Sequence, residues 1–189
     1  MVFEAARAPG VRRPPGGKSR GTLMGTDEQT SQDGDRVRRE KPLTPEQMKD
    51  ELTRRGHLVT SWEEIGGITL PTEAIATMYK IGVPDSEASP TVFKMWFPPG
   101  CTIEAHTHDC DYSEIILEGS QMVGRTWLYP GDIRIGLANR GYGPLVAGPD
   151  GASVLVIFAN GRWPGIPLGS KSDGSTLATP EITERFEVN

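Results

Sequence analysis

The sequence lacks any long hydrophobic stretch. No run among its 189 residues approaches the roughly eighteen apolar residues that a membrane-spanning helix needs. The first 17 residues carry charges where a signal peptide has its apolar segment. Both absences predict a cytoplasmic, soluble protein that does not contact a membrane.

Cysteine and histidine are also scarce. The two cysteines, Cys101 and Cys110, are too few for a disulfide framework in a chain without an export signal, so both are expected to be free thiols. The three histidines are His57, His106 and His108. His57 follows a predicted helix and is expected to be exposed or to cap that helix, which leaves two histidines for any site.

Basic residues are in deficit over most of the chain. The net charge is −5, and residues 1–23 hold five basic residues against one acidic residue, so the remainder carries −9. Phosphate binding needs clustered Lys and Arg on folded structure. The acidic body therefore argues against a nucleic-acid partner.

Glycine and proline, in contrast, are abundant. Together the 23 glycines and 16 prolines make up about a fifth of the chain, which argues against a helical bundle. One helix is predicted at 45–55, where Thr44 is a typical N-cap, Pro45 occupies the first helical position and Gly56 ends the pattern.

Short apolar segments about ten residues apart, separated by turn residues, predict an antiparallel all-β sandwich or barrel. Pro149-Asp150-Gly151 is predicted to be a turn. The predicted strands are 91–97, 114–117, 121–123, 126–129, 132–135 and 153–158.

The predicted organisation has four parts. Residues 1–41 have too few large apolar side chains to fold and are expected to be a disordered tail. Met24 offers an alternative start, so residues 1–23 stay open between native sequence, a vector remnant and a mis-assigned start. The helix and a connection follow at 42–66, the barrel at 67–162 and a C-terminal tail at 163–189 that either lies along the surface or is loose.

The candidate site is centred on His106 and His108. Two histidines two residues apart on an extended segment point to the same face, so both imidazoles can reach one ion. Glu114, a few residues further on, can add an oxygen ligand. The alternative is that both histidines face solvent on an edge strand.

These residues resemble the first motif of the cupin superfamily, in which a Gly, five residues, His-x-His, a Glu and a closing Gly follow one another. Gly100, His106, His108 and Gly119 match that pattern. Residues 129–135, with the loop to 142–144, resemble the second motif. The resemblance implies a double-stranded β-helix, or jelly-roll, barrel that holds a metal ion.

The match departs from the family at two positions. Tyr112 stands where the family has its Glu ligand, with Glu114 two residues further on, and Tyr142 stands where the family has its third His. The predicted metal ligands are therefore His106, His108 and Glu114. Two imidazoles with one carboxylate suit Fe(II), and Mn, Ni or Zn are alternatives.

Other residues are predicted to assist the site. Tyr142, Tyr112 and Glu114 are candidates for the catalytic acid or base, although both tyrosines could instead only fill the barrel. Candidate substrate-binding residues, which depend on facing inward, are Arg134, Lys94, Trp96 and Trp127.

Three functions follow from these residues. The first is a metal-dependent cupin enzyme that oxygenates, isomerises or eliminates from a small organic, carbonyl- or carboxylate-bearing molecule. The second is a metal-free cupin that binds a small ligand or regulates, and the third is a metal-free isomerase or cyclase that uses a histidine with a tyrosine. The resemblance also implies a homodimer.

Overall fold

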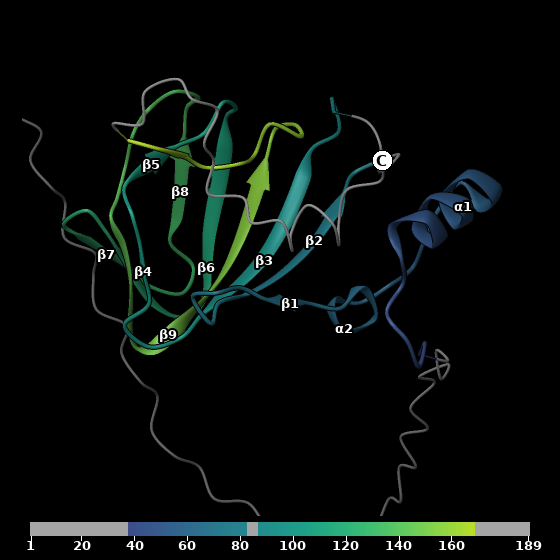
Figure 1. The fold of residues 1–189 in the computed structure, drawn as a ribbon, viewed down its shortest axis with the longest axis horizontal. Helices are drawn as coiled ribbons and strands as arrows, with labels where there is room; N and C mark the ends of the chain where they lie inside the picture. The colour runs from purple at the N-terminus through teal and green to yellow at the C-terminus, as the bar shows by residue number, and fades with distance from the viewer. Residues whose placement is uncertain (1–37, 83–86, 169–189) are drawn as a thin grey trace, which may run out of the picture. The chain divides into compact units, whose positions relative to one another are not determined.

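The computed structural model of the chain describes residues 38–82 and 87–168. Within these ranges the fold is mainly antiparallel β-sheet with few helices (Figure 1), as the all-β prediction required. The helices are α1 (Pro45–Arg55) and α2 (Trp62–Ile65). The strands are β1 (Ile68–Thr69), β2 (Ile75–Lys80), β3 (Thr91–Phe97), β4 (Thr102–Ile103), β5 (His106–Thr107), β6 (Tyr112–Val123), β7 (Thr126–Leu128), β8 (Ile133–Gly136), β9 (Leu145–Phe158) and β10 (Ile166–Pro167).

Helix α1 has the bounds that the sequence predicted. The Thr44 side chain accepts a hydrogen bond from the Gln47 backbone, the Gln47 side chain accepts one from the Thr44 backbone, and Gly56 ends the helix with φ 75°. His57 follows and is exposed, as expected. Neither helix in the described part of the chain has the length and hydrophobicity to cross a membrane.

The predicted N-terminal tail is partly wrong. Residues 1–37 lie outside the described residues, but Arg39 is bound to folded structure. Its backbone N–H donates to Glu64 at 2.9 Å, and its guanidinium donates to Glu51 at 3.1 Å and to the Val59 carbonyl at 3.2 Å. Polar and ionic contacts thus hold Arg39 without the apolar side chains on which the tail prediction relied.

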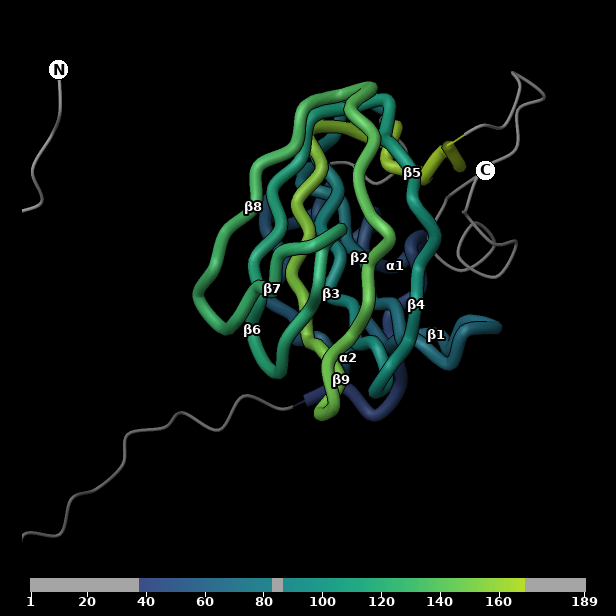
Figure 2. Tube along the Cα trace, turned by 90° about the vertical axis from the view of Figure 1, so that its left-hand side faces the viewer, coloured from purple at the N-terminus to yellow at the C-terminus, as the bar shows by residue number. Residues whose placement is uncertain are grey.

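Two long strands, β6 and β9, organise the sheet. The first half of β6 pairs with β8 and with the end of β9, and its second half pairs with β7 and with the start of β9. Strand β9 in turn pairs with β4 through its start and with β3 through its end. The chain therefore forms two layers. One contains β8, β6 and β3, and the other contains β4 and β5 (Figure 2).

Two glycines that face each other allow β6 and β9 to bend together. Gly119 and Gly151 have φ values of 70° and 78°, and a Cβ on Gly119 would lie 2.1 Å from the Gly151 carbonyl oxygen. The turn predicted at 149–151 is therefore wrong, because Gly151 bends a continuous strand there. For the same reason the predicted strands 114–117 and 121–123 are one strand.

The sequence analysis missed a strand, β2, which pairs with β3 along its whole length. At the C-terminal tail, Trp163 is buried and β10 pairs with β5, so residues 163–168 pack on the barrel, which is one of the two expected arrangements. The rest of the predicted tail, 169–189, lies outside the described residues.

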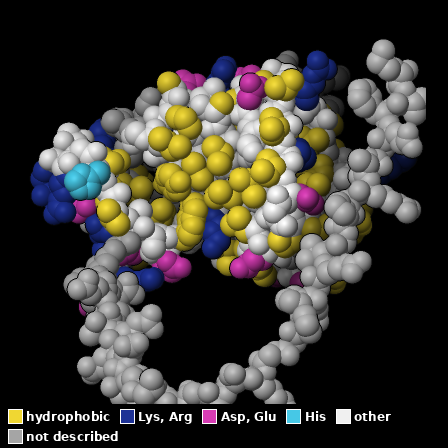
Figure 3. Space-filling view, turned by 180° about the vertical axis from the view of Figure 1, so that it is seen from behind, with side chains coloured by type: hydrophobic (Ala, Val, Ile, Leu, Met, Phe, Trp, Pro, Cys, Tyr) yellow, Lys and Arg dark blue, Asp and Glu magenta, His cyan; other side chains and the backbone are white. Residues whose placement is uncertain are grey.

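Alternation along the strands divides each layer into an inner and an outer face. In β3, Phe93, Met95 and Phe97 face the interior, which places Lys94 and Trp96 on the outside. The outer face of the layer near β8, β6 and β3 is rich in hydrophobic side chains (Figure 3).

Candidate functional site

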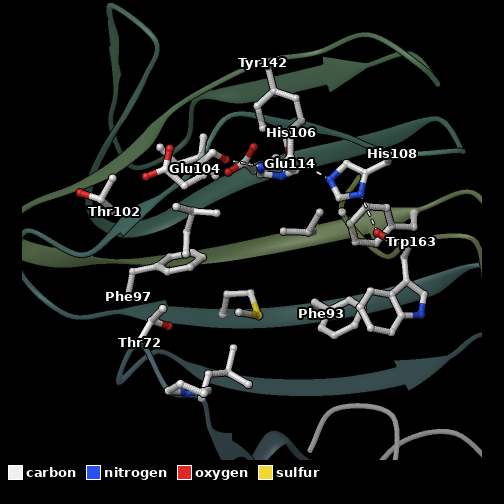
Figure 4. A pocket seen from close by; sticks show the side chains of 18 residues that line it. Thr72, Phe93, Phe97, Thr102, Glu104, His106, His108, Glu114, Tyr142 and Trp163 are labelled. Atoms are coloured by element: carbon white, nitrogen blue, oxygen red, sulfur yellow. Dashed lines mark hydrogen bonds between the residues drawn. The ribbon is translucent and has the colours of Figure 1, made fainter. Parts of the chain in front are cut away.

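A cavity of about 340 Å³ lies inside the barrel. Figure 4 shows His106, His108, Glu114 and Tyr142 gathered on one side of it. Most of the remaining wall is apolar. It includes Leu70, Phe93, Met95, Phe97, Ile103, Leu145, Val156, Phe158 and Trp163, with Thr72, Thr102 and Glu104 as its other polar residues. The cavity is in the size range of small-molecule sites and has one polar region.

The backbone fixes His106 and Tyr142 side by side. The N–H of each residue donates to the carbonyl of the other, at 3.0 and 2.9 Å, so that β5 and residue 142 form an isolated antiparallel bridge. Gly143, at φ 101°, lies next to this bridge, and a Cβ there would come 3.0 Å from the Cα of Ala105. The local sequence thus holds Tyr142 against the His-x-His strand.

Backbone carbonyls orient both imidazoles. His106 Nδ1 lies 2.7 Å from the Glu104 carbonyl oxygen, and His108 Nδ1 lies 2.5 Å from the Trp163 carbonyl oxygen. A carbonyl only accepts, so each Nδ1 carries the proton of its ring. In the neutral rings both Nε2 atoms are therefore proton acceptors.

Both Nε2 atoms meet the same phenol. Tyr142 Oη lies 2.7 Å from His106 Nε2 and 2.8 Å from His108 Nε2. A phenol has one proton, so Tyr142 can donate to only one imidazole at a time. Burial raises the pKa of Tyr142 above its ordinary value of 10, and the neighbouring Tyr112 adds to that effect, so Tyr142 is protonated at neutral pH.

The two histidines are neutral at that pH. Burial, together with the proximity of His106, lowers the pKa of His108 from 6.5 to about 4. Burial also lowers the pKa of His106. The three groups together thus contain two proton acceptors and one shared donor.

A buried ion pair lies behind this group. The Arg134 guanidinium donates to Glu114 from the directly opposite position on β8, and it also donates to Tyr112 Oη at 2.6 Å. Burial raises the pKa of Glu114, and Arg134 opposes that shift. Arg134 Cζ lies 4.0 Å from the centre of the Tyr142 ring, in cation–π contact.

The donors present do not fit the predicted metal site. Among the described residues, no three His, Cys, Asp or Glu side chains form a group that could hold a metal ion. The Glu114 carboxylate binds Arg134 instead of joining the histidines. The oxygen that contacts His106 and His108 is the phenol of Tyr142, so two imidazoles and one carboxylate do not come together.

The remaining predicted residues lie in different places. Arg134 faces inward, but its partners are protein groups, and Tyr112 lies beside it rather than in the cavity wall. Lys94 and Trp96 are on the outer face of β3, where Lys94 Nζ lies 6.0 Å from the Trp62 ring. Trp127 is 41% exposed and does not line the cavity. Lys94 and Trp96 point away from the cavity because alternation places their neighbours Phe93, Met95 and Phe97 inside.

Sequence reasoning missed Trp163, which contributes both its ring to the cavity wall and its carbonyl to His108. It lies in the segment predicted to be a C-terminal tail, and no local pattern distinguishes it. Phe93 and Phe97 were also missed as wall residues. Their alternation in β3 is the signal that could have found them.

No family model matches the sequence, and no curated protein matches it. Solved structures match its fold. The polyketide cyclase RemF from Streptomyces resistomycificus superposes with a TM-score of 0.51 at 16% identity, over 62% of this chain and 89% of that one. An RmlC-like cupin from Shewanella frigidimarina gives 0.47 at 16% identity, over 63% and 96% of the two chains. Oxalate decarboxylase from Bacillus subtilis gives 0.48 at 20%, over 59% and 33%.

The chain has the cupin fold, as its two motifs predicted. A likeness at this level of identity describes the fold alone, and this fold hosts many chemistries. The function must therefore be argued from the site.

Proposed function

We propose that the chain is an enzyme that moves a proton within a small, largely apolar substrate, with Tyr142, His106 and His108 as its acid–base group. The observation that carries the proposal is the position of Tyr142 Oη, within 2.8 Å of two imidazole Nε2 atoms at the wall of a cavity. Proton transfer by such positioned groups contributes about 10²–10⁴-fold to a rate.

The arrangement provides a proton acceptor, although burial and Arg134 disfavour a full positive charge on either imidazole. With both Nδ1 atoms protonated, one Nε2 accepts from Tyr142 while the other faces the phenol oxygen without a proton between them. A proton taken up on that second Nε2 would donate to Oη and complete the hydrogen bonding of the group. The neutral state of both histidines makes them available as bases.

The proposed step uses the phenol as the relay. Tyr142 Oη accepts a proton from a substrate carbon or hydroxyl as its own proton passes to Nε2 of His106 or His108. Return of that proton to another substrate atom restores all three groups. The cycle needs no oxidant or other reactant, so its products are an isomer or a ring-closed form of the substrate.

Arg134 supports this step electrostatically. Transient negative charge arises on the Tyr142 phenol when its proton leaves ahead of the arrival of the substrate proton, and the guanidinium that stacks on the ring at 4.0 Å stabilises that charge. Arg134 opposes the rise in the pKa of Tyr142 that burial causes. Glu114 and Tyr112 hold Arg134 in this position.

The cavity wall indicates the substrate class. Phe93, Phe97, Phe158 and Trp163 supply aromatic surface, whereas the buried charges of Glu114 and Arg134 satisfy each other. An uncharged molecule with one or a few rings and a carbonyl or hydroxyl would bury its rings there and place its polar group at Tyr142.

The alternatives from the sequence make different predictions. A metal-dependent enzyme, whether with Fe(II), Mn, Ni or Zn, would retain metal on purification and lose it in His106→Ala. A ligand-binding or regulatory protein would bind the same molecules without moving a proton. Metal content by mass spectrometry and proton exchange therefore separate the three functions.

The experiment measures deuterium incorporation from D₂O into a panel of aryl ketones and phenols of one to three rings. Compounds are first selected by thermal stabilisation of the protein. We expect incorporation next to the carbonyl, and a loss of at least about 100-fold in Tyr142→Phe with binding retained. Tyr129→Phe is the matched control, because Tyr129 is 55% exposed and remote from the cavity wall.

Two outcomes would contradict the proposal. One is equal exchange by wild type and Tyr142→Phe. The other is about one equivalent of tightly bound metal that disappears, together with exchange, in His106→Ala.

A further inference from the structure

The cavity opens to solvent on one side, and the residues there differ from the rest of its wall. The lining residues that are exposed define the mouth of the cavity: Pro71, Thr72, Thr102 and Glu104. The first two belong to the turn between β1 and β2, and the other two to β4 and the segment after it. Figure 4 shows Thr72, Thr102 and Glu104 at the end of the cavity away from Trp163.

The register of β4 and β5 directs Glu104 into the cavity. Strand β4 pairs with the start of β9, and His106 pairs with Tyr142, in one continuous antiparallel register. Alternation then places every second residue on the same face, and the members of that series all line the cavity: Thr102, Glu104, His106 and His108. Glu104 precedes His106 by two residues, about 6.6 Å along an extended chain, which is comparable to the width of one aromatic ring.

The mouth offers hydrogen-bond acceptors and no positive charge. Thr102 Oγ1 donates its proton to the Gly100 carbonyl at 3.3 Å, so its lone pairs remain as acceptors. Within residues 38–82 and 87–168, no side chain forms an ion pair or a hydrogen bond with the Glu104 carboxylate. No lysine or arginine of those two ranges lines the cavity. A ligand group at the mouth therefore binds best if it donates a proton, whereas an anionic group is repelled.

We propose that Glu104 selects substrates with a second polar group, an uncharged O–H or N–H donor, on the side of the ring opposite the reacting carbonyl. The inference rests on the proposed function, in which the carbonyl lies at Tyr142 and the ring lies along the aromatic wall. A hydroxyl or amino group across the ring from the carbonyl then reaches the mouth and donates to Glu104. A carboxylate in that position meets the Glu104 carboxylate, so carboxylate-bearing molecules are poor substrates.

The test compares acetophenones that differ only in the group para to the carbonyl, which is a hydroxyl, an amino, a methyl or a carboxyl group. Calorimetry with the full-length protein gives their dissociation constants, and deuterium exchange is followed separately. We expect the hydroxyl and amino compounds to bind at least about 10-fold more tightly than the methyl compound. The carboxyl compound should bind more weakly than the methyl compound. A preference for either donor supports the proposal and identifies the donor as O–H or N–H.

Variants of Glu104 test whether its carboxylate sets this order. Glu104→Gln removes the charge and should reduce both the preference for the donors and the penalty on the carboxyl compound. Glu104→Lys should reverse the order, so that the carboxyl compound binds more tightly than the hydroxyl compound. Glu73→Gln is the matched control, because Glu73 is an exposed carboxylate next to Thr72 that does not line the cavity. It should keep the wild-type order.

Thermal unfolding establishes that each variant is folded. Equal affinity of wild type for the four compounds, or no binding, would overturn the proposal. So would an order that persists in both Glu104 variants, or one that Glu73→Gln changes as much as they do. Binding does not require proton transfer, so the expected order without deuterium exchange would support the role of Glu104 and contradict the proposed function.

Discussion

Tyr142 is bound to His106 through both its backbone and its side chain. Reciprocal backbone hydrogen bonds of 2.9 and 3.0 Å set the distance between the two residues, and the phenol reaches His106 Nε2 at 2.7 Å. Because the backbone bridge positions the ring, the phenol can exchange its proton between two imidazoles without movement of the chain. This combination of fixed geometry and mobile proton suits acid–base chemistry.

Removal of the Tyr142 hydroxyl should destabilise the protein. In Tyr142→Phe one of the two buried Nε2 atoms loses the hydrogen bond that it accepts from the phenol, and the other loses the polar atom that faces it. We expect the free energy of unfolding to fall by about 1–3 kcal/mol. The measurement is urea-induced unfolding, and a Tyr142→Phe protein as stable as the exposed-site control Tyr129→Phe would contradict this account.

The stability should also depend on pH through His108. Its pKa is about 4 in the folded protein and 6.5 without the fold, so the unfolded chain binds the proton first as the pH falls. The contribution of neutral His108 to the free energy of unfolding is complete above pH 6.5, declines below it and is lost as the pH passes about 4. Its full magnitude is roughly 3 kcal/mol.

The pH test compares wild type with His108→Gln. Unfolding free energies measured between neutral pH and pH 4 should decline less steeply in the variant, because glutamine does not titrate. Nuclear magnetic resonance titration of the His108 ring gives its pKa directly. A ring that titrates near 6.5 in the folded protein would refute the burial argument.

Removal of one partner of the Glu114–Arg134 pair should lower the free energy of unfolding much more than replacement of both partners by apolar residues. Glu114 is 4% exposed, so Arg134→Met would leave a buried carboxylate without its counter-ion. We expect a loss of about 3–5 kcal/mol in the free energy of unfolding. The double variant Glu114→Leu with Arg134→Met should lose much less free energy of unfolding than Arg134→Met alone. A loss in the double variant that equals or exceeds that of Arg134→Met would contradict the pairing.

The sequence predicted the residues of the site better than their relationships. The spacing of His106 and His108 and the position of Tyr142 are local features, and the motifs of the fold place them at one end of the barrel. The partner of Glu114 could not be predicted, because it depends on the register that sets Arg134 opposite it on β8. Arg134 was expected to bind substrate, yet its contacts are Glu114, Tyr112 and the Tyr142 ring.

The fold was predictable where turn chemistry and alternation agree with it, as in β3 and α1. It was not predictable where a glycine bends a strand instead of ending it. Gly151 carries the composition of a turn, and only the facing Gly119 across the sheet turns that position into a bend shared by two strands. Trp163 likewise gains its role from a pairing between β10 and β5 that lies far from local sequence.

Gly136 is the residue that should tolerate a methyl group least near the site. It pairs with Tyr112, and a Cβ on it would lie 2.2 Å from the Tyr112 ring. Gly136→Ala must therefore push the ring away from β8, which would disturb the hydrogen bond between Tyr112 Oη and Arg134. We expect the free energy of unfolding, measured in urea, to fall by about 1–3 kcal/mol, a decrease typical of overpacking.

A control separates this clash from a general effect of alanine in the barrel. A Cβ added to Gly131 would have nothing within 4 Å, but the φ of 93° at that residue adds strain of its own. A better control is Gly136→Ala combined with Tyr112→Leu, because the smaller side chain leaves room for the methyl group. In the Tyr112→Leu background, Gly136→Ala should lower the free energy of unfolding only slightly. A decrease as large as in the wild-type background would show that the alanine does not displace Tyr112.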